Sequence, residues 1–262
     1  MGKAINIMLV VLSAINIRKR NMEVFLLSNG KLSGNPNWLS YAKERLDVMI
    51  EKHDICSAVL IAYAVIQGDH EQRAKELGEA LGIRVTNIER FNSPVQAIEN
   101  AECILVSGGN TWLLNQLLHE NGLIVPIQRA VRERNTPYIG WSAGCNVATP
   151  SIRTTNDMPV CNAVVIPSIG LFPVQINPHY IDSHISGHMG ETRDERLAEF
   201  CAMNPEEIVI ALREGSGLHI DGEELRYFSG KNEGFKIFQH NKFFPEQFDT
   251  KVLANWVPLR CI

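Results

Sequence analysis

The sequence predicts a three-layer α/β sandwich, in which a mostly parallel sheet lies between two layers of helices. From Met22 onward, short apolar runs rich in β-formers alternate with amphipathic helical patterns, which is typical of right-handed βαβ units. Two glycine-rich segments, 107–111 and 140–144, each follow a predicted strand. The chain has 262 residues, of which 45% are hydrophobic and 21% charged, as expected for a globular protein with a full core.

The strands are predicted from short apolar runs bounded by turn-forming residues. They cover residues 23–28, 57–63, 83–88, 102–106, 137–141, 161–166, 173–176 and 206–212. After Gly215 the runs become shorter, and we predict that 225–228 and 235–238 form a C-terminal hairpin at the edge of the same sheet.

The helices are predicted from apolar residues repeating at helical spacing. They cover 37–50, 70–81, 111–120 and 124–134, and a fifth helix begins at Thr192, where Thr192 and Glu195 have the spacing of a capping box. Since no repeat or low-complexity linker divides the chain, we expect residues 22–262 to form a single domain.

The N-terminal segment is expected to lie outside this fold. Residues 5–17 are apolar and are flanked by Lys3 and by three basic residues at 18–20. This run is too short to span a bilayer comfortably, and it lacks the small-residue cleavage site of a signal peptide. We therefore interpret residues 1–21 as an extension, with a membrane anchor as the open alternative.

Charge and cysteine content restrict the partners and the compartment. The net charge is −4 and the pI is about 6.1, so there is no basic excess for nucleic acid or for an anionic membrane surface. The six cysteines form no Cys-x-x-Cys pair. These features predict a cytoplasmic protein with reduced thiols, no nucleic-acid partner and no stable membrane association.

The segment Gly140-Trp141-Ser142-Ala143-Gly144 has the form of a nucleophile elbow. A serine at a sharp strand-to-helix turn needs small neighbours, so that Oγ is exposed and the next N–H faces a developing oxyanion. Ser142 is therefore the candidate nucleophile, although a plain Gly/Ser turn has the same composition.

A second glycine-rich turn, Ser107-Gly108-Gly109-Asn110-Thr111, lies between a predicted strand and a predicted helix. In an open α/β sheet this turn shares the carboxyl edge of the strands with the elbow, so Gly109 and Ala143 are candidate oxyanion donors. Anion binding at the helix N-terminus and a purely structural turn remain alternatives. Because neither a dinucleotide fingerprint nor a P-loop follows, we expect no cofactor.

His179 is the candidate general base, because it follows a strand that ends in Asn-Pro at the same edge. The other histidines lie in polar segments or, like His219, in an apolar run. His184 and His188 have helical metal-ligand spacing near Glu191, but the intervening glycines favour a loop, and we expect no metal site.

The carboxylate that orients the base has two candidates, Asp157 and Glu214. Asp157 lies in a polar stretch soon after the elbow, and Glu214 lies where strand 206–212 ends. The order Ser–Asp–His matches α/β-hydrolases, and Ser–His–Glu resembles the Cys–His–Glu order of class I glutamine amidotransferases. Sequence order leaves this choice open.

Five motifs together resemble the peptidase E family of α-aspartyl dipeptidases: 106–111 (VSGGNT), 138–144 (YIGWSAG), 152–159 (IRTTNDMP), 175–179 (QINPH) and 190–193 (GETR). The resemblance covers about residues 22–238. It implies a flavodoxin-like, class I glutamine amidotransferase-like fold and a serine peptidase that removes aspartate from Asp-Xaa dipeptides. It also implies Ser142 as nucleophile and His179 as base, with Asp157 or Glu214 as the acid; we prefer Glu214.

The resemblance further implies Arg193 as the partner of the substrate's aspartyl carboxylate. Asn110 is an additional candidate donor and Arg153 an alternative cation. The alternative to a substrate-binding role is that Arg193 is a solvated residue in the first turn of a helix. Oligomeric state is left open between monomer and homodimer.

Two other functions remain open. One is a cyanophycinase-like peptidase acting on β-aspartyl bonds, and the other is a catalytically silent module that binds aspartyl ligands. Two departures from the family pattern bear on this choice: Ser107 stands where the oxyanion loop often has glycine, and residues 239–262 extend past the recognisable region.

Overall fold

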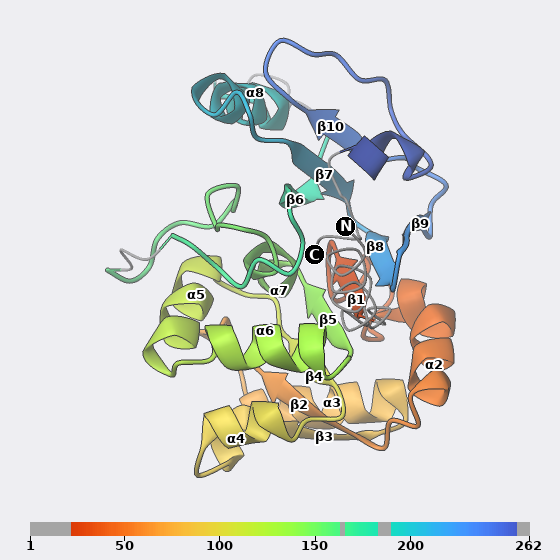
Figure 1. Ribbon diagram of the computed structural model, residues 1–262, viewed down its shortest axis with the longest axis vertical. Coiled ribbons are helices and arrows are strands. Elements are labelled where there is room, and N and C mark those ends of the chain that lie inside the picture. Colours follow the sequence, from red (N-terminus) through yellow and green to blue (C-terminus); the bar gives the residue numbers. More distant parts are fainter. Residues whose placement is uncertain (1–21, 163–165, 183–189, 256–262) are drawn as a thin grey trace, which may run out of the picture.

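The computed structural model describes residues 22–162, 166–182 and 190–255, and these residues build two sheets (Figure 1). The larger sheet has seven strands in the order β3-β2-β4-β5-β1-β8-β9, and the smaller has three in the order β10-β7-β6. The larger sheet contains β1 (Glu23–Leu27), β2 (Ser57–Ile61), β3 (Arg84–Asn87), β4 (Ile104–Val106), β5 (Tyr138–Trp141), β8 (Ser216–Asp221) and β9 (Glu224–Ser229). The smaller sheet contains β6 (Gln175–Tyr180), β7 (Val209–Arg213) and β10 (Lys236–Phe238).

The first five strands are parallel, as predicted. In the larger sheet β8 runs opposite to them, and it pairs antiparallel with both of its neighbours, β1 and β9. The order β3-β2-β4-β5 is that of the first four strands of a flavodoxin-like sheet, and β1 takes the fifth place beside β5. The carboxyl ends of β1, β4 and β5 therefore lie next to one another at the same end of the sheet.

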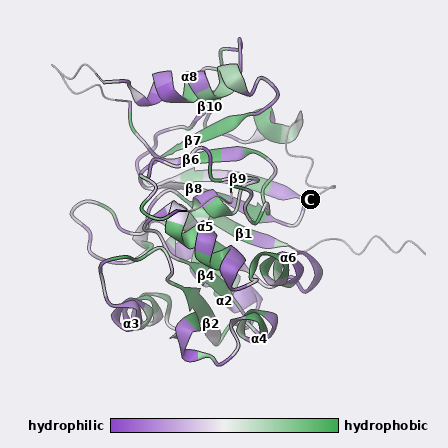
Figure 2. Ribbon diagram, turned by 90° about the vertical axis from the view of Figure 1, so that its left-hand side faces the viewer, coloured by the Kyte–Doolittle hydropathy of each residue, from purple (hydrophilic) through white to green (hydrophobic). Residues whose placement is uncertain are grey.

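Helices cover both faces of the larger sheet, which confirms the three-layer prediction. Along β1, Phe25 and Leu27 pack with α2 (Lys43–Lys52) and α3 (His70–Leu81). Val24 and Leu26 pack on the other face with α4 (Pro94–Glu99), α5 (Thr111–Glu120) and α6 (Ile124–Glu133). Figure 2 shows apolar strands inside and helices with polar outer faces. A strand buried on both faces reads as a continuous apolar run.

The remaining helices are short or lie at the smaller sheet. α7 (Ala143–Val147) directly follows β5, and α8 (Arg193–Met203) lies beside β10 at the upper end in Figure 1. The predicted capping box of α8 is present, with Thr192 and Glu195 bonded reciprocally. Three 3₁₀ turns cover Ser40–Ala42, Ile88–Arg90 and Lys251–Asn255.

Two predicted features are wrong. Segments 225–228 and 235–238 do not pair with each other: β9 pairs with β8, and β10 pairs with β7 in the smaller sheet. The edge hairpin is instead β8–β9, whose two-residue turn begins with Gly222 at φ 60°. The predicted strand 161–166 is not formed at 161, 162 or 166, and residues 163–165 lie outside the described residues.

The expectation for residues 1–21 also lies outside the described part of the chain. Within the ranges that the structure describes, no helix combines the length and the apolar character that crossing a membrane requires.

Candidate active site

The elbow serine is held in a strained conformation between β5 and α7. Ser142 has φ 53° and ψ −113°, which side-chain-bearing residues rarely adopt. Its glycine neighbours allow the turn to close: a Cβ on Gly140 would lie 2.3 Å from the Gly144 carbonyl oxygen, and one on Gly144 would lie 2.0 Å from the Val106 oxygen. The glycines are therefore required by contact with backbone and not only by flexibility.

His179 and Glu214 approach the serine from the smaller sheet. The imidazole Nε2 lies 2.8 Å from Ser142 Oγ, and Nδ1 lies 2.9 Å from Glu214 Oε1. His179 has φ 54° at a register shift between β6 and β7, and this irregularity turns its side chain toward the elbow. The structure thus brings these three residues into one hydrogen-bonded chain.

The His179 and Glu214 side chains are 37% and 45% exposed. Their electrostatic attraction is therefore screened by water, and the main effect of the carboxylate is to orient the imidazole ring. The Nδ1–H bond fixes the tautomer that leaves Nε2 free to accept the serine proton.

Two polar residues at the end of β1 hold this arrangement in place. Ser28 Oγ accepts a hydrogen bond from the His179 N–H at 2.9 Å and donates to the Leu212 carbonyl at 3.0 Å. Asn29 Oδ1 accepts from the Gly215 N–H at 2.8 Å. Neither residue was predicted from the sequence, although polar side chains directly after a buried strand at the carboxyl end of the sheet are a usable signal.

The glycine-rich turn 107–111, the predicted oxyanion loop, lies against the elbow. Gly109 has φ 145°, and a Cβ there would meet the Ala64 carbonyl oxygen at 2.1 Å. A Cβ on Gly108 would lie 2.8 Å from the Ser142 Cβ, so this loop passes directly beside the serine. The Ala143 N–H lies in the first turn of α7, where a helix has no internal acceptor for it.

Asp157 does not contact the imidazole. Its Oδ2 accepts hydrogen bonds from the Thr111 N–H at 2.7 Å, the Thr111 hydroxyl at 2.6 Å and the Thr155 hydroxyl at 3.2 Å. The carboxylate therefore caps α5, directly after the oxyanion loop. The neighbouring Asn156 donates to the Pro178 carbonyl at 2.8 Å, next to the base.

The three candidate substrate residues have different surroundings. Arg193 is half-buried at the start of α8, desolvation lowers its pKa, and within the described ranges no carboxylate pairs with it. Asn110 caps α5 through Oδ1 and donates to the Met158 carbonyl at 2.8 Å. Arg153 is not brought to the serine: it bonds Asn204 and pairs with Glu207.

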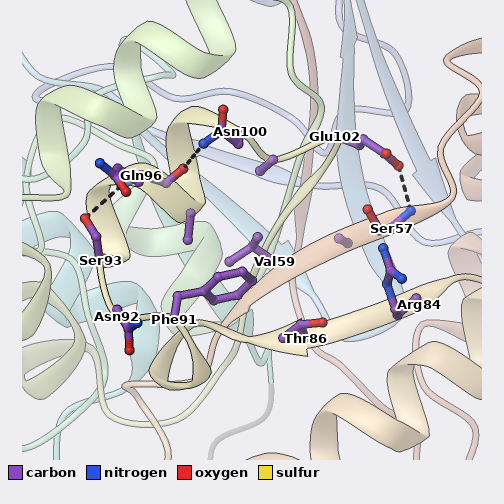
Figure 3. Close-up of a pocket in the computed structure, with 13 residues that line it drawn as sticks. Ser57, Val59, Arg84, Thr86, Phe91, Asn92, Ser93, Gln96, Asn100 and Glu102 are labelled. Carbon is purple, nitrogen blue, oxygen red and sulfur yellow. Dashed lines mark hydrogen bonds between the residues drawn. The ribbon is translucent and has the colours of Figure 1, made fainter.

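The described structure also contains a cavity of about 590 Å³ at the amino ends of β2 and β3, whereas the elbow follows the carboxyl end of β5 (Figure 3). Phe91 and Val59 face it, and the Glu102 carboxylate at its rim accepts the N–H groups of Cys56 and Ser57. The described residues that line this cavity include no histidine, cysteine or lysine, so no serine there lies beside a general base of these types.

One group of potential metal ligands, Glu23, His219 and Asp221, lies at the opposite end of β1 from the serine. The Lys52 ammonium already lies 2.7 Å from both carboxylates, so the chain supplies its own cation there. The His184–His188 pair lies outside the described residues.

The fold and the elbow with its histidine and acid define a serine hydrolase of the α/β class. The sequence model of peptidase family S51 matches residues 24–228. Peptidase E of Salmonella arizonae is 42% identical over 202 residues, covering 76% of this chain and 86% of that protein. Peptidase E of Citrobacter koseri is 42% identical over 203 residues with the same coverage.

A solved peptidase structure from an acI-B1 actinobacterium has a TM-score of 0.62 at 16% identity and covers 87% of this chain and 94% of its own. This likeness concerns the fold. The chain belongs to peptidase family S51, which confirms the resemblance found in the sequence and makes the protein a peptidase.

Proposed function

We propose that this peptidase hydrolyses dipeptides with an N-terminal aspartate, using Ser142 as nucleophile, His179 as general base and Glu214 as the acid that orients the base. The observation that carries the proposal is the continuous chain from Ser142 Oγ through both imidazole nitrogens to the Glu214 carboxylate. Membership of family S51 and the relatives named peptidase E support it.

In the proposed reaction, Ser142 Oγ attacks the carbonyl carbon of the aspartyl residue while His179 Nε2 takes the hydroxyl proton. The Gly109 and Ala143 N–H groups stabilise the negative oxygen of the tetrahedral intermediate. The imidazolium then protonates the leaving amine, and the C–N bond breaks to leave an aspartyl ester on Ser142. Water then attacks the ester carbonyl carbon while His179 takes its proton. The imidazolium returns this proton to Ser142 Oγ as the ester bond breaks and aspartate leaves.

Specificity for aspartate is assigned to Arg193. An aspartyl carboxylate that loses water in the site needs a cation, and a guanidinium offers two parallel donors. Arg193 supplies a half-buried charge without a carboxylate partner in the described ranges, close to Tyr180 beside the base. Asn110 is a secondary candidate, because one of its amide hydrogens already bonds Met158. Arg153 is not assigned a role in substrate binding, because its guanidinium already bonds Asn204 and Glu207.

The test is hydrolysis of matched Asp-Leu, isoAsp-Leu, Asn-Leu, Glu-Leu and Ala-Leu by the wild type, Ser142→Ala and Arg193→Met. We expect cleavage of Asp-Leu that Ser142→Ala abolishes and that Arg193→Met weakens mainly through KM. Arg196→Met is the matched control, since Arg196 lies in the same helix and pairs with Glu191 at the surface.

Other outcomes would replace the proposal. Preferential cleavage of isoAsp-Leu would indicate a β-aspartyl peptidase of the cyanophycinase kind. Tight aspartate binding without cleavage of any dipeptide would indicate a silent binding module.

We also propose that the enzyme works in the cytoplasm, as a monomer or homodimer, with residues 22–262 as one catalytic domain. The five cysteines in the described part of the chain are free thiols, as expected in a reducing compartment.

A further inference from the structure

An arginine from a neighbouring helix reaches the oxyanion loop. Arg73, on α3, donates from Nη1 to the Ser107 hydroxyl at 2.6 Å and to the Gly108 carbonyl oxygen at 3.1 Å. The Ser107 hydroxyl in turn donates to the same carbonyl oxygen at 3.0 Å. The Gly108 carbonyl therefore accepts two hydrogen bonds, one of them from a charged donor.

The guanidinium is held firmly in this position. It stacks over the Trp38 ring, 5.1 Å from the ring centroid, and Trp38 packs against Trp141, the residue before the nucleophile. The Trp38 indole N–H donates to Glu76 at 2.7 Å, which fixes the ring. Desolvation lowers the pKa of Arg73, so its half-buried position has an energetic cost that hydrogen bonds must offset.

The geometry of one peptide unit connects this contact to the site. The Gly108 carbonyl and the Gly109 N–H belong to the same planar trans unit, so they point in opposite directions. A donor that fixes the Gly108 oxygen on one side therefore fixes the Gly109 hydrogen on the other. Hydrogen bonding to the carbonyl also polarises the N–H and makes it a better donor.

Fixing this unit matters because both residues are glycines. Gly109 already has φ 145°, and a glycine pair is free to rotate its peptide plane unless something holds it. An oxyanion donor stabilises the transition state only when it is oriented in advance. The Ser107 hydroxyl supplies the second hydrogen bond to the Gly108 carbonyl and accepts one from the arginine.

We propose that Arg73 is a positioning residue, which together with Ser107 holds the 108–109 peptide unit so that the Gly109 N–H points at the oxyanion. This inference rests on the proposed function, in which Gly109 is an oxyanion donor. It adds α3 to the elements that build the site.

The test compares Arg73→Met, Arg73→Lys, Ser107→Ala and the double variant Arg73→Met/Ser107→Ala with wild type on Asp-Leu. We expect Arg73→Met to lower kcat by about 10- to 100-fold with KM within about twofold, since a misplaced oxyanion donor affects the transition state. Arg73→Lys should recover part of the loss because it restores a charged donor. The double variant should lose little more than Arg73→Met, because both residues act on one carbonyl.

Inhibitor binding separates positioning from general loosening. An aspartyl boronic acid forms a tetrahedral adduct with Ser142 that resembles the transition state, whereas free aspartate forms no bond to Ser142 and keeps a planar carboxylate. We expect the Ki of the boronic acid to rise by the same factor as kcat falls, with the Ki of aspartate unchanged. Arg45→Met is the matched control, since Arg45 stacks on Phe228 without reaching the loop.

The proposal is overturned if Arg73→Met keeps kcat within about twofold of wild type, if the boronic acid Ki does not change, or if Arg45→Met causes an equal loss. If Arg73→Met does not fold, full activity and full boronic acid affinity of both Arg73→Lys and Ser107→Ala overturn it.

The positioning role of Arg73 can be tested even if the proposed substrate is wrong. If wild type does not cleave Asp-Leu, the measured quantity becomes the rate at which a fluorophosphonate phosphonylates Ser142. In that reaction Oγ attacks phosphorus, fluoride leaves, His179 takes the proton and the phosphoryl oxygen enters the oxyanion site. A slower reaction of Arg73→Met supports the positioning role, and an equal rate, or no reaction of wild type, contradicts it.

Discussion

At the scale of single residues, the site depends on two backbone conformations that are unfavourable. Ser142 and His179 both have positive φ, at 53° and 54°. Such positions cost roughly 1–3 kcal/mol each and persist only where the surroundings hold them. Here the Ser142 N–H donates to the Leu27 carbonyl and the His179 N–H to Ser28 Oγ, at 3.0 and 2.9 Å. Both strained residues are therefore tied to the end of the same strand.

Glu214→Gln tests the assignment of the acid. The amide has nearly the same shape, but its NH₂ group can donate to Nδ1 and so favour the tautomer that carries its proton on Nε2. That tautomer cannot accept the serine proton, so we expect kcat to fall by about 10²- to 10⁴-fold with little change in KM. Steady-state kinetics on Asp-Leu measure this, and a loss below about threefold would contradict the orienting role.

Some of the site residues could be predicted from the sequence and others could not. The difference is how far along the chain each residue lies from the partners that define its role. Ser142 and Gly109 belong to local motifs, so their neighbours in sequence define them. The choice between Asp157 and Glu214 depends on which strand lies beside His179, which sequence order does not give. Ser28 reaches His179 across 151 positions and Asn29 reaches Gly215 across 186. The local sequence marks Ser28 and Asn29 as polar residues directly after a buried strand, but it does not identify the distant partners that they reach.

At the scale of elements, the segment 155–158 connects parts that carry different catalytic groups. Asp157 caps α5, which follows the oxyanion loop, and Asn156 bonds the carbonyl before His179. Through these two contacts, a change at Asp157 can shift both the 107–111 turn and His179, although Asp157 does not contact the imidazole.

We therefore expect Asp157→Asn to destabilise the protein by about 1 kcal/mol, through the weaker cap, and also to lower kcat. Ser93→Ala is the control, because Ser93 caps α4 through the Gln96 N–H and α4 carries none of the proposed site residues. That variant should lose similar stability and keep its kcat. Urea unfolding and kinetics on both variants check this, and equal kcat values would reduce Asp157 to a structural cap.

The elements themselves followed the sequence closely where burial is two-sided. The parallel strands β1, β2 and β4 contain continuous apolar runs, and the Thr192 capping box marks a helix start that depends only on two residues three positions apart. The C-terminal hairpin was mispredicted because the short runs at 225–228 and 235–238 have similar character. Their assignment depends on which exposed edge each one meets, β8 in the larger sheet or β7 in the smaller.

At the scale of the whole molecule, the site lies where the two sheets meet. Ser142 and the oxyanion loop belong to the larger sheet, whereas His179 comes from β6 and Glu214 from the turn between β7 and β8. Ser142 and His179 therefore meet only when both sheets are assembled.

A buried ionic cluster joins β1, β8 and the end of α2 at the far end of the larger sheet. Burial raises the pKa of Glu23, but hydrogen bonds from His219, Lys52 and His53 outweigh it and lower the pKa to about 2. A folded-state pKa below the unfolded value stabilises the fold above about pH 4.5, and this stabilisation is lost as the pH falls through about 2.

Glu23→Gln should therefore lower the free energy of unfolding at pH 7 by about 3 kcal/mol and have a much smaller effect near pH 2. Because the cluster is remote from Ser142, kcat of the folded variant should equal that of wild type. Urea unfolding at several pH values measures the difference. A difference that is constant with pH would show that the charge of Glu23 is not its source.

In the proposed reaction, Ser142 forms a covalent aspartyl intermediate with the help of His179. The most direct measurement is rapid acid quenching of the enzyme during Asp-Leu turnover, followed by mass spectrometry of the peptide that contains residue 142. We expect an adduct with the mass of one aspartyl residue on Ser142, absent from Ser142→Ala and from samples given Ala-Leu. Steady cleavage of Asp-Leu by Ser142→Ala, or an adduct on another residue, would contradict the account.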